Sequence, residues 1–329
     1  MSIRLLFLAT AILLGCGSTA VAQSTANSQS DTLARDTVIV VDALPGEGFN
    51  FPYVLYLPKG MKMSGETTLI VETNNGGLND TLEHHKKTAI HAASKSGVAN
   101  YVARRLKIPL LVPVFPRSAT QWTVYTHALD RDAFLSNDPA IHRLDLQLIA
   151  MVESARKLLS NSNVSLDEQF FITGFSASGT LANRFSLLHP QLLKATASGG
   201  INAIAILPLS QLEGTPLKFP LGIADVEQVT GRKVQMDAFK KLPKMLYMGA
   251  LDDNDAAAFD DAYNEEERQQ IYKFMGRRSM PERWAFMEDM YRQHGIEATF
   301  ITYPHIGHGT DLRINNELVA FFRNYLKDR

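Results

Sequence analysis

The chain has almost no cysteine, no excess of charge and no long apolar stretch. Because Cys16 is its only cysteine, no internal disulfide can form, and the fold must be stabilised by packing. The 33 Lys and Arg residues and 34 Asp and Glu residues give a formal net charge of -1, which argues against a nucleic-acid partner. The apolar run from Leu5 to Leu14 is too short for a stable membrane span, and no other segment qualifies. We therefore predict no transmembrane segment.

Cofactor and metal motifs are missing as well. The sequence contains no phosphate-binding loop and no dinucleotide fingerprint, which predicts that the protein uses no cofactor. His84, His85 and His91 lie in a stretch with helical spacing, but they lack the His-Glu-x-x-His spacing of a zinc-binding helix. No later carboxylate stands in register with them, so we predict no metal site.

The N-terminus has the pattern of an export signal. Arg4 precedes the apolar run, and the small residues Ala20 to Ala22 form a cleavage motif, so residues 1–22 are predicted to be a signal peptide of a periplasmic or secreted protein. In a competing interpretation, the Leu-Leu-Gly-Cys sequence that ends at Cys16 is a lipoprotein signal, and a lipid on this cysteine anchors the protein to a membrane. The polar stretch 23–36 is predicted to be a disordered leader under both schemes.

Residues 37–329 are predicted to form one α/β domain. The chain is 45% hydrophobic, which is enough to bury a substantial core. Strand patterns alternate with helical ones, and this favours a mostly parallel central sheet flanked by helices. Segment 202–242 mixes Pro, Gly and apolar residues and is a candidate cap insertion over the site. Strands are expected at 37–41, 51–57, 67–72, 109–114, 169–175, 244–249 and 298–303, and helices at 79–106 and 143–159.

The most informative motif surrounds Ser176. An apolar, β-prone run leads into it and a helical pattern follows, so the serine lies at a sharp turn between strand and helix. Small residues two positions before and after, Gly174 and Ser178, let the backbone fold tightly enough to present a nucleophilic hydroxyl. Ser178 stands where a second glycine is usual, and as a nucleophile it would itself need a small residue at Thr180. We predict Ser176 as the nucleophile; the alternative is a turn that needs small residues only for packing.

A serine nucleophile needs an acid and a base from later strands. Strand 244–249 opens into an acidic loop, in which Asp252 lies closest to the strand end. It is the predicted acid, with Asp253 and Asp255 as alternatives.

Two histidines follow strand 298–303. His308 lies between Gly307 and Gly309, which leave the loop free to aim an imidazole, whereas His305 directly follows a proline at the strand end. We predict His308 as the base. Serine, acid and histidine then occur in the chain order of the α/β-hydrolases.

Residues from Gly174 to Gly179, together with Asn183-Arg184-Phe185 and Leu188-His189-Pro190, carry a family resemblance. From about Thr37 to its C-terminus the chain resembles the α/β-hydrolase superfamily, and is most similar to secreted bacterial esterases and polyhydroxybutyrate-depolymerase-like hydrolases. The resemblance implies the α/β-hydrolase fold and an oxyanion hole that combines the Ala177 amide with one from the loop after strand 67–72. Two glycines make this loop permissive, and Asn75 or Gly76 is the expected second donor, unless the loop is an ordinary Asn-Gly turn.

Segment 118–139 follows a strand at the expected active edge of the sheet. Its Trp122, Tyr125 and His127 are candidates for lining a substrate pocket. The alternative is a surface loop that holds a structural Arg–carboxylate pair within Asp130-Arg131-Asp132.

These patterns predict an exported serine hydrolase that cleaves small-molecule or polymeric carboxylic esters through an acyl-enzyme intermediate. A serine peptidase or amidase on the same fold would use the same residues, so it stays an alternative. A non-catalytic binding protein that kept the fold is a second alternative, although loss of a triad residue would be its expected signature.

Overall fold

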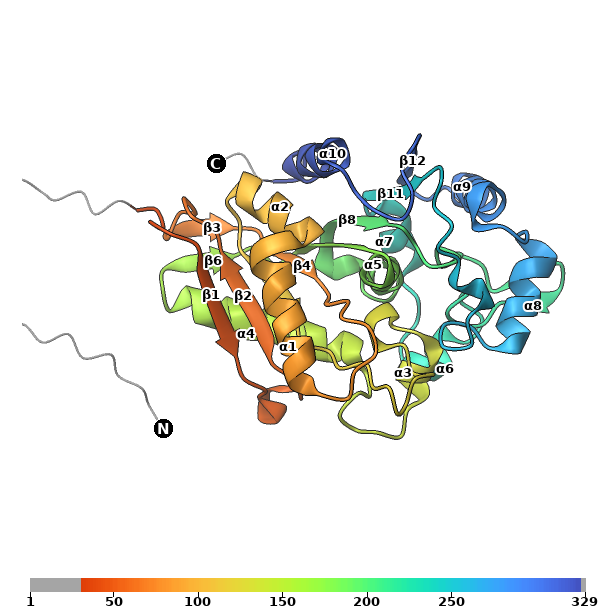
Figure 1. Ribbon diagram of the computed structural model, residues 1–329, viewed down its shortest axis with the longest axis horizontal. Coiled ribbons are helices and arrows are strands. Elements are labelled where there is room, and N and C mark those ends of the chain that lie inside the picture. The colour runs from red at the N-terminus through yellow and green to blue at the C-terminus, as the bar shows by residue number, and fades with distance from the viewer. Residues whose placement is uncertain (1–30, 327–329) are drawn as a thin grey trace, which may run out of the picture. The chain divides into compact units, whose positions relative to one another are not determined.

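The structure, a computed structural model, describes residues 31–326 (Figure 1). The predicted signal peptide, Cys16 and most of the predicted leader lie outside the described residues. A single sheet of eight strands runs through the described part, and its strands are mostly parallel. In spatial order they are β1 (Thr37–Val41), β2 (Tyr53–Leu57), β5 (Leu110–Pro113), β4 (Ile70–Glu72), β7 (Phe170–Phe175), β8 (Leu193–Gly199), β11 (Lys244–Gly249) and β12 (Ala298–Tyr303).

Only the first edge of the sheet is antiparallel. Strand β2 pairs antiparallel with both β1 and β5, and every later pairing in the sheet is parallel. Two short pairs lie outside this sheet: β3 (Gly65–Thr67) with β6 (Val164–Leu166), and β9 (Gln211–Leu212) with β10 (Thr215–Pro216).

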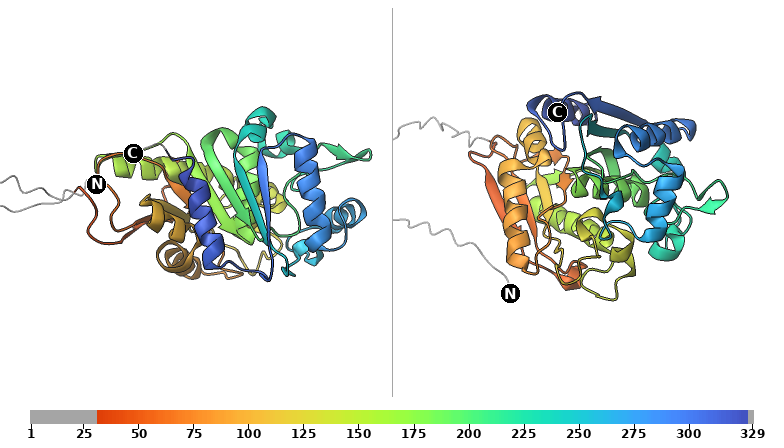
Figure 2. Two further views of the ribbon diagram at one scale, coloured as in Figure 1. Left: turned by 90° about the horizontal axis from the view of Figure 1, so that it is seen from above. Right: turned by 45° about the vertical axis from the view of Figure 1, so that its right-hand side comes forward.

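Helices cover both faces of the sheet (Figures 1 and 2). Side chains alternate along a strand, and in β7 Phe171 enters one hydrophobic cluster while Phe170 and Ile172 enter the other. The α-helices are α1 (Leu82–His91), α2 (Val98–Leu106), α3 (Arg131–Leu135), α4 (Leu144–Ser160), α5 (Ala177–Leu188), α6 (Val226–Thr230), α7 (Met236–Lys241), α8 (Glu265–Phe274), α9 (Trp284–Gln293) and α10 (Leu312–Arg323). Shorter 3-10 turns span Pro45–Glu47, Thr126–Ala128, Pro190–Leu192 and Ala256–Ala258, and π-turns span Ala92–Ser96 and Ser279–Arg283.

The predicted α/β class with a mostly parallel, helix-flanked sheet is confirmed. The single helix expected at 79–106 is instead α1, a π-turn and α2, because Gly97 has an extended backbone that interrupts the helical course. The strand expected at 67–72 is likewise divided between β3 and β4.

Segment 202–242 contains β9, β10, α6 and α7. The β9–β10 ribbon projects away from the sheet in both views of Figure 2. Across residues 31–326, no helix combines the length and apolar character that a bilayer span requires.

Candidate active site

Ser176 lies between the end of β7 and the start of α5, in a backbone conformation that side chains rarely adopt. Its φ of 61° and ψ of -127° make it strained, and the surrounding turn holds it there. The Ser176 amide donates to the carbonyl of Gly199 in β8 at 2.9 Å. A Cβ atom on Gly174 would approach the backbone of Ser178 to 2.4 Å, so this turn requires glycine at position 174.

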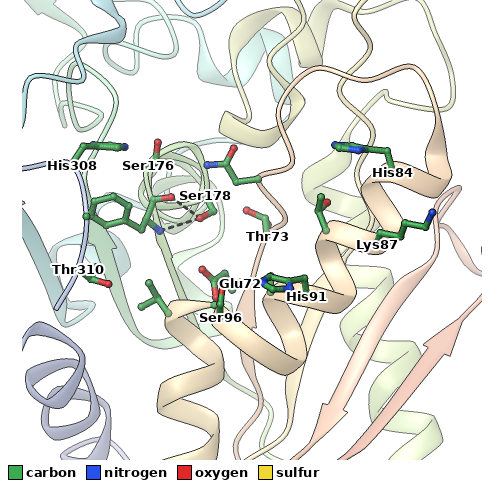
Figure 3. Close-up of a pocket in the computed structure, with 17 residues that line it drawn as sticks. Glu72, Thr73, His84, Lys87, His91, Ser96, Ser176, Ser178, His308 and Thr310 are labelled. Carbon is green, nitrogen blue, oxygen red and sulfur yellow. Dashed lines mark hydrogen bonds between the residues drawn. The ribbon is translucent and has the colours of Figure 1, made fainter. Parts of the chain in front are cut away.

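The serine at position 178 has its own role in this turn. Its hydroxyl donates to the carbonyl of Phe175 at 2.9 Å and accepts from the Phe175 amide at 3.0 Å, as the dashed lines in Figure 3 show. Ser178 therefore satisfies both backbone groups of the residue before the nucleophile. The close approach to β8 is made one residue later, because a Cβ on Gly179 would lie 2.4 Å from the Gly199 oxygen.

Asp252 and His308 meet although 56 residues separate them. The His308 Nδ1 atom lies 2.9 Å from Oδ2 and 3.0 Å from Oδ1 of Asp252. The two loops are tied together by the Leu251 amide, which donates to the Ile306 carbonyl at 2.9 Å. The structure thus brings the predicted acid and base within hydrogen-bonding distance.

The His308 ring is also held on its other sides. It packs against the ring of Phe175, with centroids 4.8 Å apart, and its Nε2 atom lies 3.0 Å from Nδ2 of Asn254. A carboxylate at Nδ1 and an amide donor at Nε2 together favour the neutral tautomer that carries its proton on Nδ1. That tautomer has its lone pair on Nε2, where a general base needs it, and in this structure the lone pair accepts from Nδ2 of Asn254.

The alternative acids and base have other surroundings. Asp255 forms an ion pair with buried Arg283 and accepts from the Ala257 amide at 3.0 Å, so it fixes a turn. Asp253 is exposed on its loop, and His305, unlike His308, does not line the pocket beside Ser176.

The hydroxyl of Ser176 lies 3.5 Å from Oδ1 of Asn202. Within residues 31–326 it forms no hydrogen bond with His308. Figure 3 shows His308 and Ser176 next to each other at one wall of a pocket. Both residues line this pocket, where the hydroxyl of Ser176 lies toward Asn202 and the Nε2 atom of His308 lies toward Asn254.

Of the three expected oxyanion donors, Asn75 lines the pocket, whereas Ala177 and Gly76 are not among its lining residues. Ala177 is the first residue of α5, so its amide has no acceptor within the helix. Asn75 lines the pocket, and the loop that carries it is fixed from two sides. His84 lies with Nε2 at 2.8 Å from the Gly76 carbonyl, while the side chain of Asn74 donates to the Phe115 carbonyl at 2.8 Å and accepts from its amide at 3.0 Å.

The pocket has a volume of about 750 Å³ and opens beside Ser176 (Figure 3). Its wall is formed by β4 and the loop after it, by α1 and the segment that joins it to α2, by the turn around Ser176 and by the loop after β12. The lining residues are Glu72, Thr73, Asn75, His84, Lys87, Thr88, His91, Ala92, Ser96, Gly97, Val98, Phe175, Ser176, Ser178, His308, Gly309 and Thr310.

The expected pocket residues of segment 118–139 are not among these. Trp122 is 46% exposed, and Tyr125 lies under the guanidinium of Arg117, 3.4 Å from its ring centre. His127 is fully buried with Nε2 at 2.9 Å from the Phe115 carbonyl, and burial lowers the pKa of His127 to about 3. The prediction that His127 lines a substrate pocket is therefore wrong, because packing beneath the loop has removed it from solvent.

The alternative interpretation of segment 118–139 was a surface loop that holds a structural Arg–carboxylate pair, and an ion pair of this kind is present. Arg131 forms a structural ion pair, at 2.6 Å, with Asp225 from outside the segment. Asp130 caps α3 by accepting from the Ala133 amide at 2.9 Å.

Sequence reasoning missed Glu72, Asn202 and Asn254. Glu72 ends β4, lines the pocket and accepts from the Ala99 amide at 2.8 Å, so it caps α2. Burial raises the pKa of Glu72 to about 7.

Glu72, Asn202 and Asn254 are all polar residues at or just past the carboxyl end of a sheet strand, where α/β proteins place their sites. That signal could have identified Glu72 and Asn254, whereas Asn202 follows β8, a strand that was not predicted.

A metal centre finds no support in residues 31–326, in which no group of three or more His, Cys, Asp and Glu side chains is arranged to hold an ion.

No protein-family model and no curated protein matches the chain. Solved structures do resemble it. It is similar to the fluorophosphonate-binding serine hydrolase F of Staphylococcus aureus, with a TM-score of 0.50 and 13% identity over 89% of this chain and 100% of that one. S-formylglutathione hydrolase from Agrobacterium tumefaciens gives a TM-score of 0.49 and 13% identity over 88% of this chain and 94% of that one.

A larger protein, described as a dipeptidyl aminopeptidase IV from Bacteroides ovatus, gives a TM-score of 0.48 and 13% identity. The match covers 91% of this chain and 36% of that one, so the chain spans about a third of that protein's length. At such identities the likeness to the Staphylococcus aureus structure shows the fold alone. Together with the strand order, it confirms that residues 31–326 adopt the α/β-hydrolase fold.

Proposed function

We propose that the protein is a serine hydrolase that cleaves carboxylic esters, with Ser176 as nucleophile, His308 as base and Asp252 as the acid that orients the base. The observation that carries this proposal is one shared pocket. It is lined both by a strained serine at a strand–helix turn and by a histidine whose Nδ1 atom contacts a buried carboxylate. A fluorophosphonate-binding serine hydrolase is among the structures with this fold.

The proposed mechanism requires the Ser176 hydroxyl to turn from Asn202 and His308 Nε2 to release Asn254 Nδ2. His308 takes the Ser176 proton on Nε2 as the serine oxygen attacks the ester carbonyl, and Asp252 stabilises the imidazolium through Nδ1. Negative charge on the carbonyl oxygen is stabilised by the Ala177 amide and by a donor at Asn75 or Gly76. His308 then returns the proton to the leaving alcohol. A water molecule repeats the sequence on the acyl-enzyme and releases the acid.

Export belongs to the same proposal. The pattern of residues 1–22 supports a periplasmic or secreted enzyme, and the sequence around Cys16 supports a lipid-anchored one as the alternative.

The test is covalent labelling of the folded protein with a fluorophosphonate, followed by peptide mass spectrometry. We expect an adduct on Ser176 that is absent from Ser176→Ala and from heat-unfolded protein. Ser178→Ala is the matched variant: it removes the neighbouring hydroxyl, so an adduct on Ser176 should persist in it, at a lower rate because the turn loses two hydrogen bonds.

Failure to label folded protein, or labelling at Ser178, would overturn the nucleophile assignment. Ester cleavage is then checked by comparing p-nitrophenyl esters with p-nitroanilides. Faster turnover of the anilides would replace the esterase proposal by a peptidase or amidase.

A further inference from the structure

One wall of the pocket is basic. Helix α1 contributes His84, Lys87 and His91, which recur at helical spacing and therefore share one face of the helix. Figure 3 shows them along α1, across the pocket from Ser176 and His308.

The opposing charge in the pocket is weak. Glu72 is the one acidic residue among the described residues that line it, and its side chain is already engaged by the Ala99 amide at the start of α2. Burial raises the pKa of this carboxyl, so its negative charge is reduced near neutral pH. Lys87 therefore carries the positive charge that sets the sign of the potential at this wall, beside His84, whose Nε2 atom lies against the Gly76 carbonyl, and His91.

Polar residues outnumber apolar ones in the lining, in which Ala92, Val98 and Phe175 are the apolar side chains. Apolar atoms nevertheless form a large part of the pocket surface, so the pocket offers space for the hydrocarbon part of an ester beside the basic groups of α1.

We propose that the enzyme prefers esters that carry a carboxylate, and that the α1 wall, with Lys87 at its rim, recognises this anion. The inference rests on the proposed function and names its substrate class. Lys87 is exposed and its ammonium points away from Ser176 in Figure 3, so it would meet the anion at the pocket mouth after a rotamer change. The anion can belong to the acyl part or to the alcohol part of the ester, and the test separates these two.

The experiment measures kcat/KM for matched ester pairs. The acyl pair is p-nitrophenyl butyrate and p-nitrophenyl hemiglutarate; the alcohol pair is phenyl butyrate and p-butyryloxybenzoate. We expect the anionic member to be preferred in one pair, and the pair that shows the preference identifies the part of the ester that faces α1.

The variant that tests the wall is Lys87→Glu. It should lower the ratio of anionic to neutral kcat/KM about tenfold, since it replaces an attraction by a repulsion at the pocket mouth, and added salt should reduce this difference. Lys86→Glu is the matched control: it makes the same charge change on the neighbouring residue of α1, which does not line the pocket, so its ratio should stay near that of the unmodified enzyme.

Two failures can be told apart. If Ser176 is labelled by fluorophosphonate and esters are cleaved, but neither pair shows a preference or both lysine variants give the same ratio, the carboxylate proposal is wrong and the hydrolase proposal stands. If Ser176 is not labelled and no ester is cleaved, both proposals are wrong.

Discussion

Residues 31–326 contain two histidine–aspartate pairs of nearly equal length in two different environments. His308 Nδ1 lies 2.9 Å from Asp252 Oδ2, and His189 Nε2 lies 2.8 Å from Asp145 Oδ2. The side chains of the first pair are 27% and 3% exposed, and those of the second are 1% and 0% exposed. The difference is on the histidine side: one ring reaches the pocket and the other is enclosed.

The enclosed pair belongs to the packing around the end of α5. The His189 ring lies against Phe185, with centroids 4.8 Å apart, and its Nδ1 atom is buried without a hydrogen-bond partner in the described part of the chain. Arg143 adds two hydrogen bonds to Asp145, at 2.8 and 2.9 Å. A carboxylate–imidazole contact is therefore no mark of catalysis by itself; the second ring nitrogen must reach a reacting group.

The largest effect is expected at the pocket pair. His308→Gln should lower kcat/KM by about a thousandfold or more, because no group remains to accept the serine proton, while thermal unfolding stays close to that of the unmodified protein. Ester hydrolysis and a melting curve on the same preparation test this.

The acid is tested by a neighbouring pair of substitutions. Asp252→Asn should lose activity by about a hundredfold or more, because the amide no longer favours the required tautomer, and Asp253→Asn should lose far less. Equal losses would show that Asp252 is not the acid that orients His308.

At the enclosed pair the effect should appear in stability instead. Asp145→Asn removes the charge that Arg143 and His189 face, and breaking such a buried pair costs about 3–5 kcal/mol of unfolding free energy. Activity per folded molecule should be retained, since none of these residues lines the pocket beside Ser176. Urea unfolding monitored by circular dichroism measures the loss.

The pH dependence of stability gives this prediction its sign. Burial opposes ionisation of Asp145, yet the hydrogen bonds from Arg143 and His189 hold the pKa of Asp145 at about 2, below its ordinary value of 3.8. A lowered folded-state pKa contributes stability that is present above the unfolded value and is lost as the pH falls through about 2. Asp145→Asn should flatten that acid limb. The control is Glu153→Gln. Glu153 is exposed and pairs with half-buried Arg156, so its replacement should cost less than about 1 kcal/mol of unfolding free energy.

How far the sequence could predict the fold is seen by comparing β8 with β11 and β12. The last two are rich in large apolar and aromatic residues, and their predicted bounds of 244–249 and 298–303 are those of the structure. Strand β8 was not predicted, because Lys, Ala and Gly, which have weak strand propensity, make up most of it and Thr196 is its one β-branched residue. Its small residues are required by tertiary contacts: a Cβ on Gly199 would lie 2.1 Å from the Tyr247 ring. No local pattern reports such a contact.

The candidate site, like the sheet, has parts that the sequence pattern predicts and parts that depend on tertiary contacts. The chain order and the strand ends were enough to predict Ser176, Asp252 and His308 as candidates, and the structure brings the last two into contact. The pocket could not be predicted, since its far wall is formed by α1, whose polar face resembles a solvated surface in the sequence. The prediction that His127 lines a pocket was wrong because a polar residue in a long loop is typical of a surface. Only the fold shows that His127 is buried.

The smallest effect on activity is expected at Asn202, the residue that the Ser176 hydroxyl contacts in this structure in place of His308. Asn202 is buried, and its backbone is held at both ends. The backbone amide donates to Thr180 Oγ1 at 2.9 Å, and the backbone carbonyl accepts from the Tyr263 hydroxyl at 2.9 Å. Its contact with the serine hydroxyl is long, at 3.5 Å, and long hydrogen bonds are weak. Asn202→Ala should therefore lower kcat by less than about tenfold and leave KM nearly unchanged.

Asn202→Asp separates a positioning role from simple packing. It keeps the shape but places a carboxylate beside the Ser176 hydroxyl. A charged acceptor holds this hydroxyl more strongly than the amide oxygen does, so Asn202→Asp should lower kcat and the rate of fluorophosphonate labelling more than the alanine does. If alanine instead costs a thousandfold while the protein stays folded, Asn202 acts on the reacting atoms as directly as His308. The difference between the two histidine–aspartate pairs would then depend on what holds the serine as much as on what each histidine reaches.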